Sequence, residues 1–318
     1  MKAKRLTQTA EAAVHLIAGE LVAIPTETVY GLAANGLDDQ AVARIFKAKN
    51  RPFFDPLILH VSSIEQAQSL CQLWPEEAEK LSHAFWPGPL TLVLPKSDKV
   101  PNIVSSDLPT VGLRMPQHSL TLELLKSLNF PLAAPSANPF GYVSPTTAEH
   151  VFDQLGDNIQ AVLDGGPCRV GIESTIVKWD ERGVHLLRLG AITQEQIEAV
   201  VGPITLADSI QGGIQAPGQL EQHYSPNCRI TLLEPGAMGP TPNSQTAVVQ
   251  FQQSQQPWLA HRYFLSKNGE LAEAAASVFA VLRELDKQGY AHAFIEQAPK
   301  QGLGLAINDR LKRAAAKR

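Results

Sequence analysis

The stretch Pro25-Thr26-Glu27-Thr28-Val29-Tyr30-Gly31-Leu32 is the most informative part of this 318-residue chain. It follows a short apolar run at residues 21–24, which predicts a strand. The basic run Lys47-Ala48-Lys49-Asn50-Arg51-Pro52 comes at the end of the helix that we expect next. Hydroxyl groups, a glycine and clustered cations therefore fall within one predicted βα unit and its exit. Such a group suits a small polar substrate that is bound beside a polyanion.

Outward from this unit, apolar runs alternate with amphipathic segments over residues 1–206. Helices are expected at residues 10–19, from Asp38 or Asp39 onward, and at residues 63–73. Strands are expected at residues 21–24, 57–61, 90–94, 111–114, 132–134, 161–164, 175–178 and 185–188. This mixture predicts an α/β (α+β) fold, in which helices cover a sheet.

The character of the chain changes after residue 206. Residues 207–227 are rich in glycine, proline and glutamine, and glycine and proline interrupt helices and strands, which predicts a linker. Beyond it we expect strands at residues 229–233, 247–251 and 293–296, a long amphipathic helix that ends at Gly289, and a last helix at 304–317. The predicted organisation is a first domain at 1–206, a linker at 207–227 and a smaller α/β domain at 228–318.

Composition limits the class of protein. The net charge of −4 gives no global basic field, which argues against nucleic acid as the main ligand. The three cysteines, Cys71, Cys168 and Cys228, form no CxxC pair and are odd in number, so we expect a reducing, cytoplasmic environment. No apolar stretch is long enough to span a bilayer, and we expect no membrane contact.

Lys49 and Arg51 are the first candidate site residues. Two cations at the end of a helix can converge on one phosphate group. The alternative is a solvated helix end, where the helix dipole favours cations. The hydroxyls of Thr26, Thr28 and Tyr30 indicate either a ligand site or a hydrogen-bonded turn.

A second loop, Pro135-Ser136-Ala137-Asn138-Pro139-Phe140-Gly141, has the same polar character and follows another apolar run. Its small residues would let a ligand approach the backbone. Ser144-Pro145 is typical of an N-cap and a first helical residue, which is either an anion site or a simple cap.

Single polar residues at predicted strand ends are weaker candidates. His60 is either a ligand or a satisfied structural histidine. Arg114 could clamp a carboxylate or pair with a surface acid, and Thr110 flanks the same strand. Ser174 could face a substrate or bond to its own turn, and a lone arginine such as Arg188 is usually solvated.

Several common site motifs are absent from the sequence. It has no Gly-x-x-x-x-Gly-Lys-Ser/Thr loop, no Gly-x-Gly-x-x-Gly after the first strand and no Gly-x-Ser-x-Gly elbow. No His or Cys spacing indicates zinc, and we expect no metal site in the protein itself.

The order of the motifs is more specific than any one of them. Residues 25–32, Lys49-x-Arg51-Pro52, Asp55-Pro56-Leu57, Trp86-Pro87-Gly88-Pro89-Leu90-Thr91, Ser136-Ala137-Asn138 and Glu173-Ser174-Thr175 resemble, in this order, the motifs of the YrdC-like family of threonylcarbamoyl-AMP synthases. Pro217-Gly218 and His223-Tyr224-Ser225-Pro226 look like the linker of its two-domain members. Gln219 and Gln222 stand where that linker usually carries lysine.

The resemblance implies a twisted, open, mixed β-sheet with covering helices, followed by a smaller Rossmann-like domain. It also implies an enzyme that condenses L-threonine, bicarbonate and ATP, with Mg²⁺ on the ATP and no structural metal. The product would feed the tRNA threonylcarbamoyl-transferase machinery, and contact with tRNA is possible. The linker would cover the pocket through His223 and Tyr224.

Two sets of binding residues follow from the resemblance. Threonine would be bound by Thr28, His60, Arg114, Ala134 and Ser174. The nucleotide would be bound by Arg51, Asp55, Thr110, Ser136, Asn138, Ser144, Arg188 and Tyr224. Lys49 and Arg51 would act in catalysis.

Three rival hypotheses remain at this stage. The fold could serve as an RNA-binding module, since Lys312, Arg313, Lys317 and Arg318 form a basic tail, although interleaved aromatics are lacking. It could carry out carbamoyl-adenylate chemistry with another amine or another carbamoyl donor. It could also be a scaffold without activity.

Overall fold

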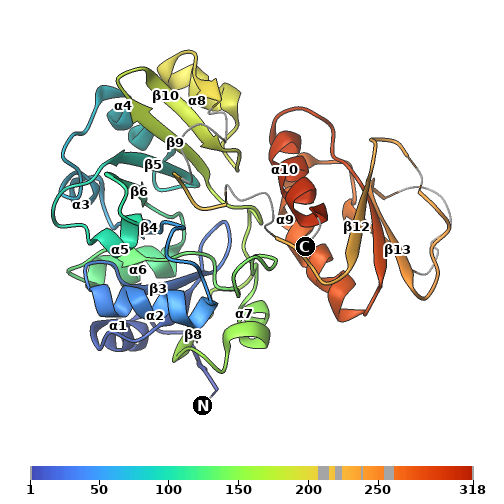
Figure 1. Ribbon diagram of the computed structural model, residues 1–318, viewed down its shortest axis with the longest axis horizontal. Coiled ribbons are helices and arrows are strands. Elements are labelled where there is room, and N and C mark those ends of the chain that lie inside the picture. Colours follow the sequence, from blue (N-terminus) through green and yellow to red (C-terminus); the bar gives the residue numbers. More distant parts are fainter. Residues whose placement is uncertain (1, 207–214, 219–223, 238, 254–260, 317–318) are drawn as a thin grey trace. The chain divides into compact units, whose positions relative to one another are not determined.

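The structure is a computed structural model that describes residues 2–206, 215–218, 224–237, 239–253 and 261–316 (Figure 1). These residues form two compact units. Unit 1 contains residues 2–140, 145–168, 173–206 and 215–218. Unit 2 contains residues 141–144, 169–172 and the described part of the chain from 224 onward. The predictions made above for Gln219, Gln222, His223, Lys317 and Arg318 concern residues outside the described part of the chain.

A single eleven-stranded sheet forms the centre of unit 1, in the order β1-β8-β2-β3-β7-β4-β6-β5-β9-β10-β11. The strands are β1 Lys4–Leu6, β2 Val22–Ile24, β3 Gly31–Asn35, β4 Ile58–His60, β5 Leu90–Pro95, β6 Thr110–Arg114, β7 Leu132–Ala133, β8 Ala161–Leu163, β9 Thr175–Asp180, β10 Gly183–Arg188 and β11 Thr205–Leu206. The sheet contains both parallel pairs, such as β4–β6, and antiparallel pairs, such as β5–β6. The predicted mixed sheet is confirmed.

Helices cover both faces of this sheet because its strands are apolar on both sides. They are α1 Thr9–Ile17, α2 Asp39–Lys49, α3 Ile64–Gln68, α4 Glu76–Phe85, α5 Asn102–Ser105, α6 Ser119–Ser127, α7 Ala148–Leu155 and α8 Gln194–Val201. Val22 and Ile24 belong to the core cluster that includes α1 and α6, whereas Ala23 belongs to the cluster that includes α2. Asp38 caps α2 by accepting hydrogen bonds from the amides of Gln40 and Ala41.

Two local predictions are wrong. The stretch after β2 does not belong to a βα unit: it turns the chain back into β3, which pairs antiparallel with β2. The run Gly-Leu-Ala-Ala-Asn of β3 is short and consists mostly of small side chains, so it shows no alternation of polar and apolar residues that would predict a strand. Ser144-Pro145 does not begin a helix either. The α7 helix begins at Ala148, and the hydroxyl of Thr147 caps it by accepting from the amide of His150.

Unit 2 has a four-stranded parallel sheet in the order β12-β15-β13-β14. Its elements are β12 Arg229–Leu233, β13 Thr246–Gln252, β14 Arg262–Ser266, α9 Leu271–Lys287, β15 His292–Glu296 and α10 Leu303–Ala315. The predicted apolar face of α9 is buried at Ala275, Val278, Leu282 and Leu285, and Gly289 follows the helix with φ of 72°. β14 was not predicted.

No helix among the residues that the structure describes is long and apolar enough to cross a membrane.

Candidate active site

The turn at residues 26–30 is built around the hydroxyl of Thr26. This oxygen accepts hydrogen bonds from the amides of Thr28 at 3.1 Å and Val29 at 3.2 Å. It donates to the carbonyl of Val29 and lies 2.8 Å from the hydroxyl of Thr28. The turn hypothesis is therefore confirmed for Thr26, and the Thr28 hydroxyl is held in a fixed, buried position.

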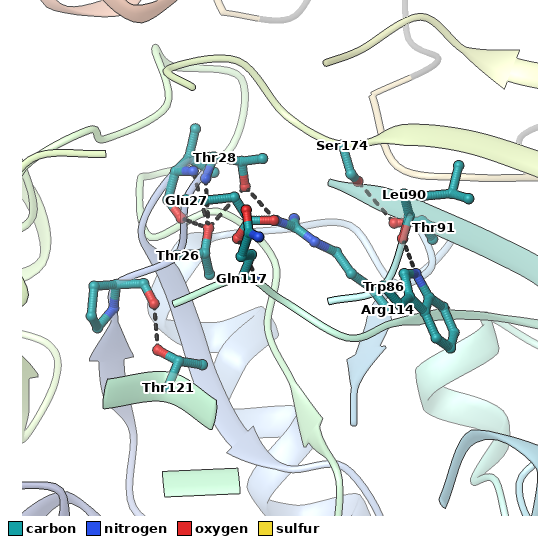
Figure 2. Close-up of polar contacts among 12 residues, drawn as sticks. Thr26, Glu27, Thr28, Trp86, Leu90, Thr91, Arg114, Gln117, Thr121 and Ser174 are labelled. Atoms are coloured by element: carbon teal, nitrogen blue, oxygen red, sulfur yellow. Dashed lines mark hydrogen bonds and ion pairs between the residues drawn. The ribbon is translucent and has the colours of Figure 1, made fainter. Parts of the chain in front are cut away.

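The guanidinium of Arg114 meets this turn (Figure 2). Its Nη2 atom lies 2.8 Å from Oε1 of Glu27 and donates to the hydroxyl of Thr28 at 2.9 Å. Glu27 is held in turn by the amide of Gln117, 3.0 Å from Oε2. Because Glu27 and Arg114 are both buried, the surface-acid hypothesis for Arg114 is wrong. A buried, compensated arginine of this kind is suited to binding a carboxylate.

His60 lies beside Arg114, because the two residues are register partners in the parallel β4–β6 pair. Burial, together with the charge of Arg114, lowers the pKa of His60 to about 3, so the ring is neutral at pH 7. In the described part of the chain, Nδ1 of His60 and Nε of Arg114 are buried without a hydrogen-bond partner. Orphaned polar atoms of this kind are rare in interiors and mark a place where a polar ligand can bind.

Ser174 takes part in a second polar group. Its hydroxyl lies 2.8 Å from the hydroxyl of Thr91, as Figure 2 shows, and accepts from Nη2 of Arg188 at 3.1 Å. Arg188 also donates from Nε and Nη2 to the Ser174 carbonyl, and from Nη1 to the carbonyl of Pro217. The hypotheses of a solvated Arg188 and of a serine bonded only to its own turn are therefore wrong.

Lys49, Arg51 and Asp55 form a buried charged cluster, with exposures of 1%, 6% and 1%. Nη2 of Arg51 lies 2.9 Å from Oδ2 of Asp55, and the hypothesis of a solvated helix end is wrong. Burial and the charge of Arg51 lower the pKa of Lys49 well below its usual value. Burial raises the pKa of Asp55, against the charges of Arg51, Lys49 and Arg188. Lys49, Arg51 and Arg188 thus lie near one carboxylate, and a group of basic side chains of this kind suits a polyanion.

Lys49 also brings the second predicted loop to this cluster. Its Nζ atom donates to the carbonyls of Ser136 and Asn138. The backbone carbonyl of Lys49 in turn accepts a hydrogen bond from the amide of Phe140. At the start of this loop Gly31 approaches Ala134 so closely that a Cβ on Gly31 would lie 3.2 Å from the Ala134 Cβ. The two sequence motifs therefore form one surface in unit 1.

The other candidates have different surroundings. Thr110 begins β6 and lines a small hollow beside Ala216. Ser144 and Tyr224 are fully buried residues of unit 2.

Sequence reasoning missed Glu27 and Thr91 as members of the polar groups. Both stood inside quoted motifs, but their partners lie far away in the sequence: Ser174 is 83 residues from Thr91, and Arg114, the partner of Glu27, belongs to β6. No metal-binding group of three or more His, Cys, Asp or Glu side chains is found among the described residues.

The fold and the two polar groups define an α/β domain with a buried, polar and cationic candidate site, followed by a smaller parallel α/β unit. Two family models match: Sua5_yciO_yrdC, described as telomere recombination, over residues 15–190, and the C-terminal domain of threonylcarbamoyl-AMP synthase over residues 192–316. The chain therefore belongs to the two-domain Sua5 family of threonylcarbamoyl-AMP synthases.

Similarity to individual relatives extends over both units. The chain is 40% identical to a threonylcarbamoyl-AMP synthase of Pyrococcus abyssi, over 94% of this chain and 92% of the relative. It is 40% identical to one of Bacillus subtilis, over 98% and 94%. The crystal structure of P. abyssi Sua5 complexed with L-threonine matches with a TM-score of 0.88 and 37% identity, over 99% of this chain and 97% of that one.

Proposed function

We propose that this protein condenses L-threonine, bicarbonate and ATP into threonylcarbamoyl-AMP and releases pyrophosphate. The observation that carries the proposal is similarity along the whole chain to proteins of that name, one of them solved with L-threonine. The buried polar groups of unit 1 supply side chains suited to both substrates.

Threonine would be bound by Thr28, His60, Arg114, Ala134 and Ser174. Arg114 is suited to the α-carboxylate, since Glu27 fixes its guanidinium while Nε remains without a protein partner in the described part of the chain. Ser174, held by Thr91 and Arg188, would orient the substrate. Neutral His60 can hydrogen-bond without adding a charge.

The nucleotide would be bound beside the cationic cluster. Its proposed ligands are Arg51, Asp55, Thr110, Ser136, Asn138, Ser144, Arg188 and Tyr224. Arg51 and Lys49 would stabilise the negative charge that develops on the α-phosphate and the departing pyrophosphate. Lys49 would also hold the loop of Ser136 and Asn138.

The proposed chemistry needs no protein nucleophile. The threonine amine and bicarbonate form a carbamate with loss of water, and a carbamate oxygen attacks the α-phosphorus of ATP as pyrophosphate leaves. Both reactants are anions, so fixed cations and correct alignment lower the barrier; alignment alone can contribute roughly 7–11 kcal/mol. The first predicted domain, 1–206, would carry these steps, with 207–227 as linker and 228–318 as a separate domain.

Mg²⁺ belongs to the proposal only as a companion of ATP. The carboxylate of Asp55 is already paired with Arg51, so the charged cluster does not form a magnesium site of its own. Mg²⁺ would be held by the phosphate oxygens.

The product would pass to the machinery that transfers the threonylcarbamoyl group to tRNA. We place the enzyme in the cytoplasm, where thiols stay reduced. The three cysteines are free, and burial raises the pKa of Cys71 and Cys168 to about 12.

The test is pyrophosphate release from ATP with bicarbonate, measured with L-threonine, with L-serine and without an amino acid. We expect strong dependence on threonine and bicarbonate. A rate of pyrophosphate release that does not depend on threonine would reject the proposal. Tight, steeply salt-dependent tRNA binding without turnover would favour the RNA-binding hypothesis instead.

A further inference from the structure

Side chains of helix α9 of unit 2 form hydrogen bonds with two short segments, and each segment carries one proposed nucleotide ligand. The first is residues 141–144, which end at Ser144. The second is residues 224–228, which begin at Tyr224. All of these residues belong to unit 2. Neither α9 nor its polar side chains belong to the proposed set of nucleotide ligands.

Arg283 of α9 holds the first segment. Its Nε atom donates to the carbonyl of Ser144 at 3.2 Å, and its Nη2 atom donates to the carbonyl of Val143. The guanidinium also lies over the ring of Tyr142, 5.3 Å from the centroid. Arg283 is 8% exposed, and Val143 and Ser144 are fully buried. The side chain therefore fixes the backbone of the segment from inside the unit.

Asp286, one turn further along α9, joins the two segments. Oδ2 accepts from the hydroxyl of Tyr142 at 2.6 Å and from the amide of Asn227 at 2.9 Å. Oδ1 accepts from the amide of Cys228 at 2.9 Å. One carboxylate thus receives hydrogen bonds from both segments, and these charge-assisted bonds are stronger than neutral ones.

Tyr224 is held by the same helix and by α10. Its ring stacks on Phe279 of α9 with centroids 5.2 Å apart, and Arg310 lies 5.4 Å from its centroid. The backbone of Tyr224 has φ of 61°, a left-handed conformation that persists only where the surroundings enforce it. The amide of Ser225 donates to the carbonyl of Gly141, which ties the two segments to each other.

We propose that Arg283 and Asp286 are positioning residues for the nucleotide, which set the places of Ser144 and Tyr224 through the segments 141–144 and 224–228. This inference rests on the proposed function.

The test compares four variants in the full-length protein. Arg283→Met keeps most of the side-chain length but removes the charge and the hydrogen-bond donors. Asp286→Asn keeps the side-chain shape and removes the negative charge, and Tyr142→Phe removes one hydroxyl. Glu284→Gln is the matched control, because Glu284 lies on α9 between the two and its side chain accepts a hydrogen bond from Gln288, which lies outside both segments. Each variant is examined by calorimetric titration with ATP and with threonine, by the separate KM values, and by thermal unfolding.

We expect Arg283→Met and Asp286→Asn to weaken ATP binding about tenfold, with threonine binding within about twofold of the wild type. Tyr142→Phe should weaken ATP binding about threefold, since it removes a single bond. Glu284→Gln should change neither the affinity for ATP nor the affinity for threonine.

An ATP affinity that stays at the level of the Glu284→Gln control, with a lower unfolding temperature alone, would overturn the proposal. So would an equal loss of affinity for both substrates. If Arg283→Met does not fold, Asp286→Asn and Tyr142→Phe decide the question. Because the ATP titration needs no turnover, a wild type that binds ATP but releases no pyrophosphate would reject the proposed function and still test this inference.

Discussion

Nη2 of Arg114 lies 2.8 Å from Oε1 of Glu27, and the two side chains are 4% and 1% exposed. An arginine from the end of β6 is thus compensated by a carboxylate from the turn after β2. The pair is preorganised before any substrate arrives, and the Thr28 hydroxyl shares the same Nη2 atom.

Breaking this pair should affect stability and threonine binding together. We expect Glu27→Ala to lower the free energy of unfolding by about 3–5 kcal/mol, because it leaves a buried arginine without its counterion. Urea unfolding measures this loss. Saturating threonine should restore part of it, since the substrate carboxylate replaces the missing charge. A variant that is equally unstable with and without threonine would contradict the assignment of Arg114.

Lys49→Met should weaken ATP binding more than threonine binding. The change removes a buried cation and its bonds to the carbonyls of Ser136 and Asn138. We expect a rise in KM for ATP of about tenfold or more, since bonds to a charged group are worth about 1.5–3 kcal/mol. Lys47→Met is the matched control, because Lys47 lies on the same helix and is exposed. Similar kinetics in both variants would refute a role for Lys49 at the phosphates.

Thr91→Val tests whether binding of the substrate L-threonine depends on the orientation of the Ser174 hydroxyl. The change keeps the shape and removes the hydroxyl that lies 2.8 Å from the Ser174 hydroxyl. We expect the KM for threonine to rise about fivefold, with the KM for ATP unchanged, from the loss of one buried hydrogen bond. Thr9→Val, a buried threonine of α1 bonded to Glu123, provides the control. It should affect stability alone.

The buried histidine predicts a specific dependence of stability on pH. The pKa of His60 is about 3 in the folded protein and near 6.5 in the unfolded chain. Since the folded pKa is depressed, its contribution is complete above pH 6.5 and is lost as pH falls towards 3. Between pH 7 and pH 5 the loss is about 2 kcal/mol.

His60→Gln removes this group from the titration. The free energy of unfolding of the variant, followed by urea denaturation, should fall less between pH 7 and pH 5 than that of the wild type, by about 2 kcal/mol. Parallel pH profiles would show that His60 is not buried as a neutral ring.

The sequence alone determined the class of fold and the main elements. Apolar runs predicted β4, β5, β6 and β9 because all four strands contribute buried side chains to the core of unit 1. Helical spacing predicted α9 because its apolar face packs in the core of unit 2. The order of short motifs also identified the family, since each motif depends on local residue types.

Only the tertiary structure decided which polar groups meet. It paired Glu27 with Arg114 and Thr91 with Ser174, contacts that join different strands and turns. It turned residues 25–32 into a hairpin and moved the helix start from Ser144 to Ala148, where the Thr147 cap is available. The physical reason is the range of the interactions. Propensity and period act over a few residues, whereas a buried charge or hydroxyl takes whichever partner the packing of distant segments brings within 3 Å.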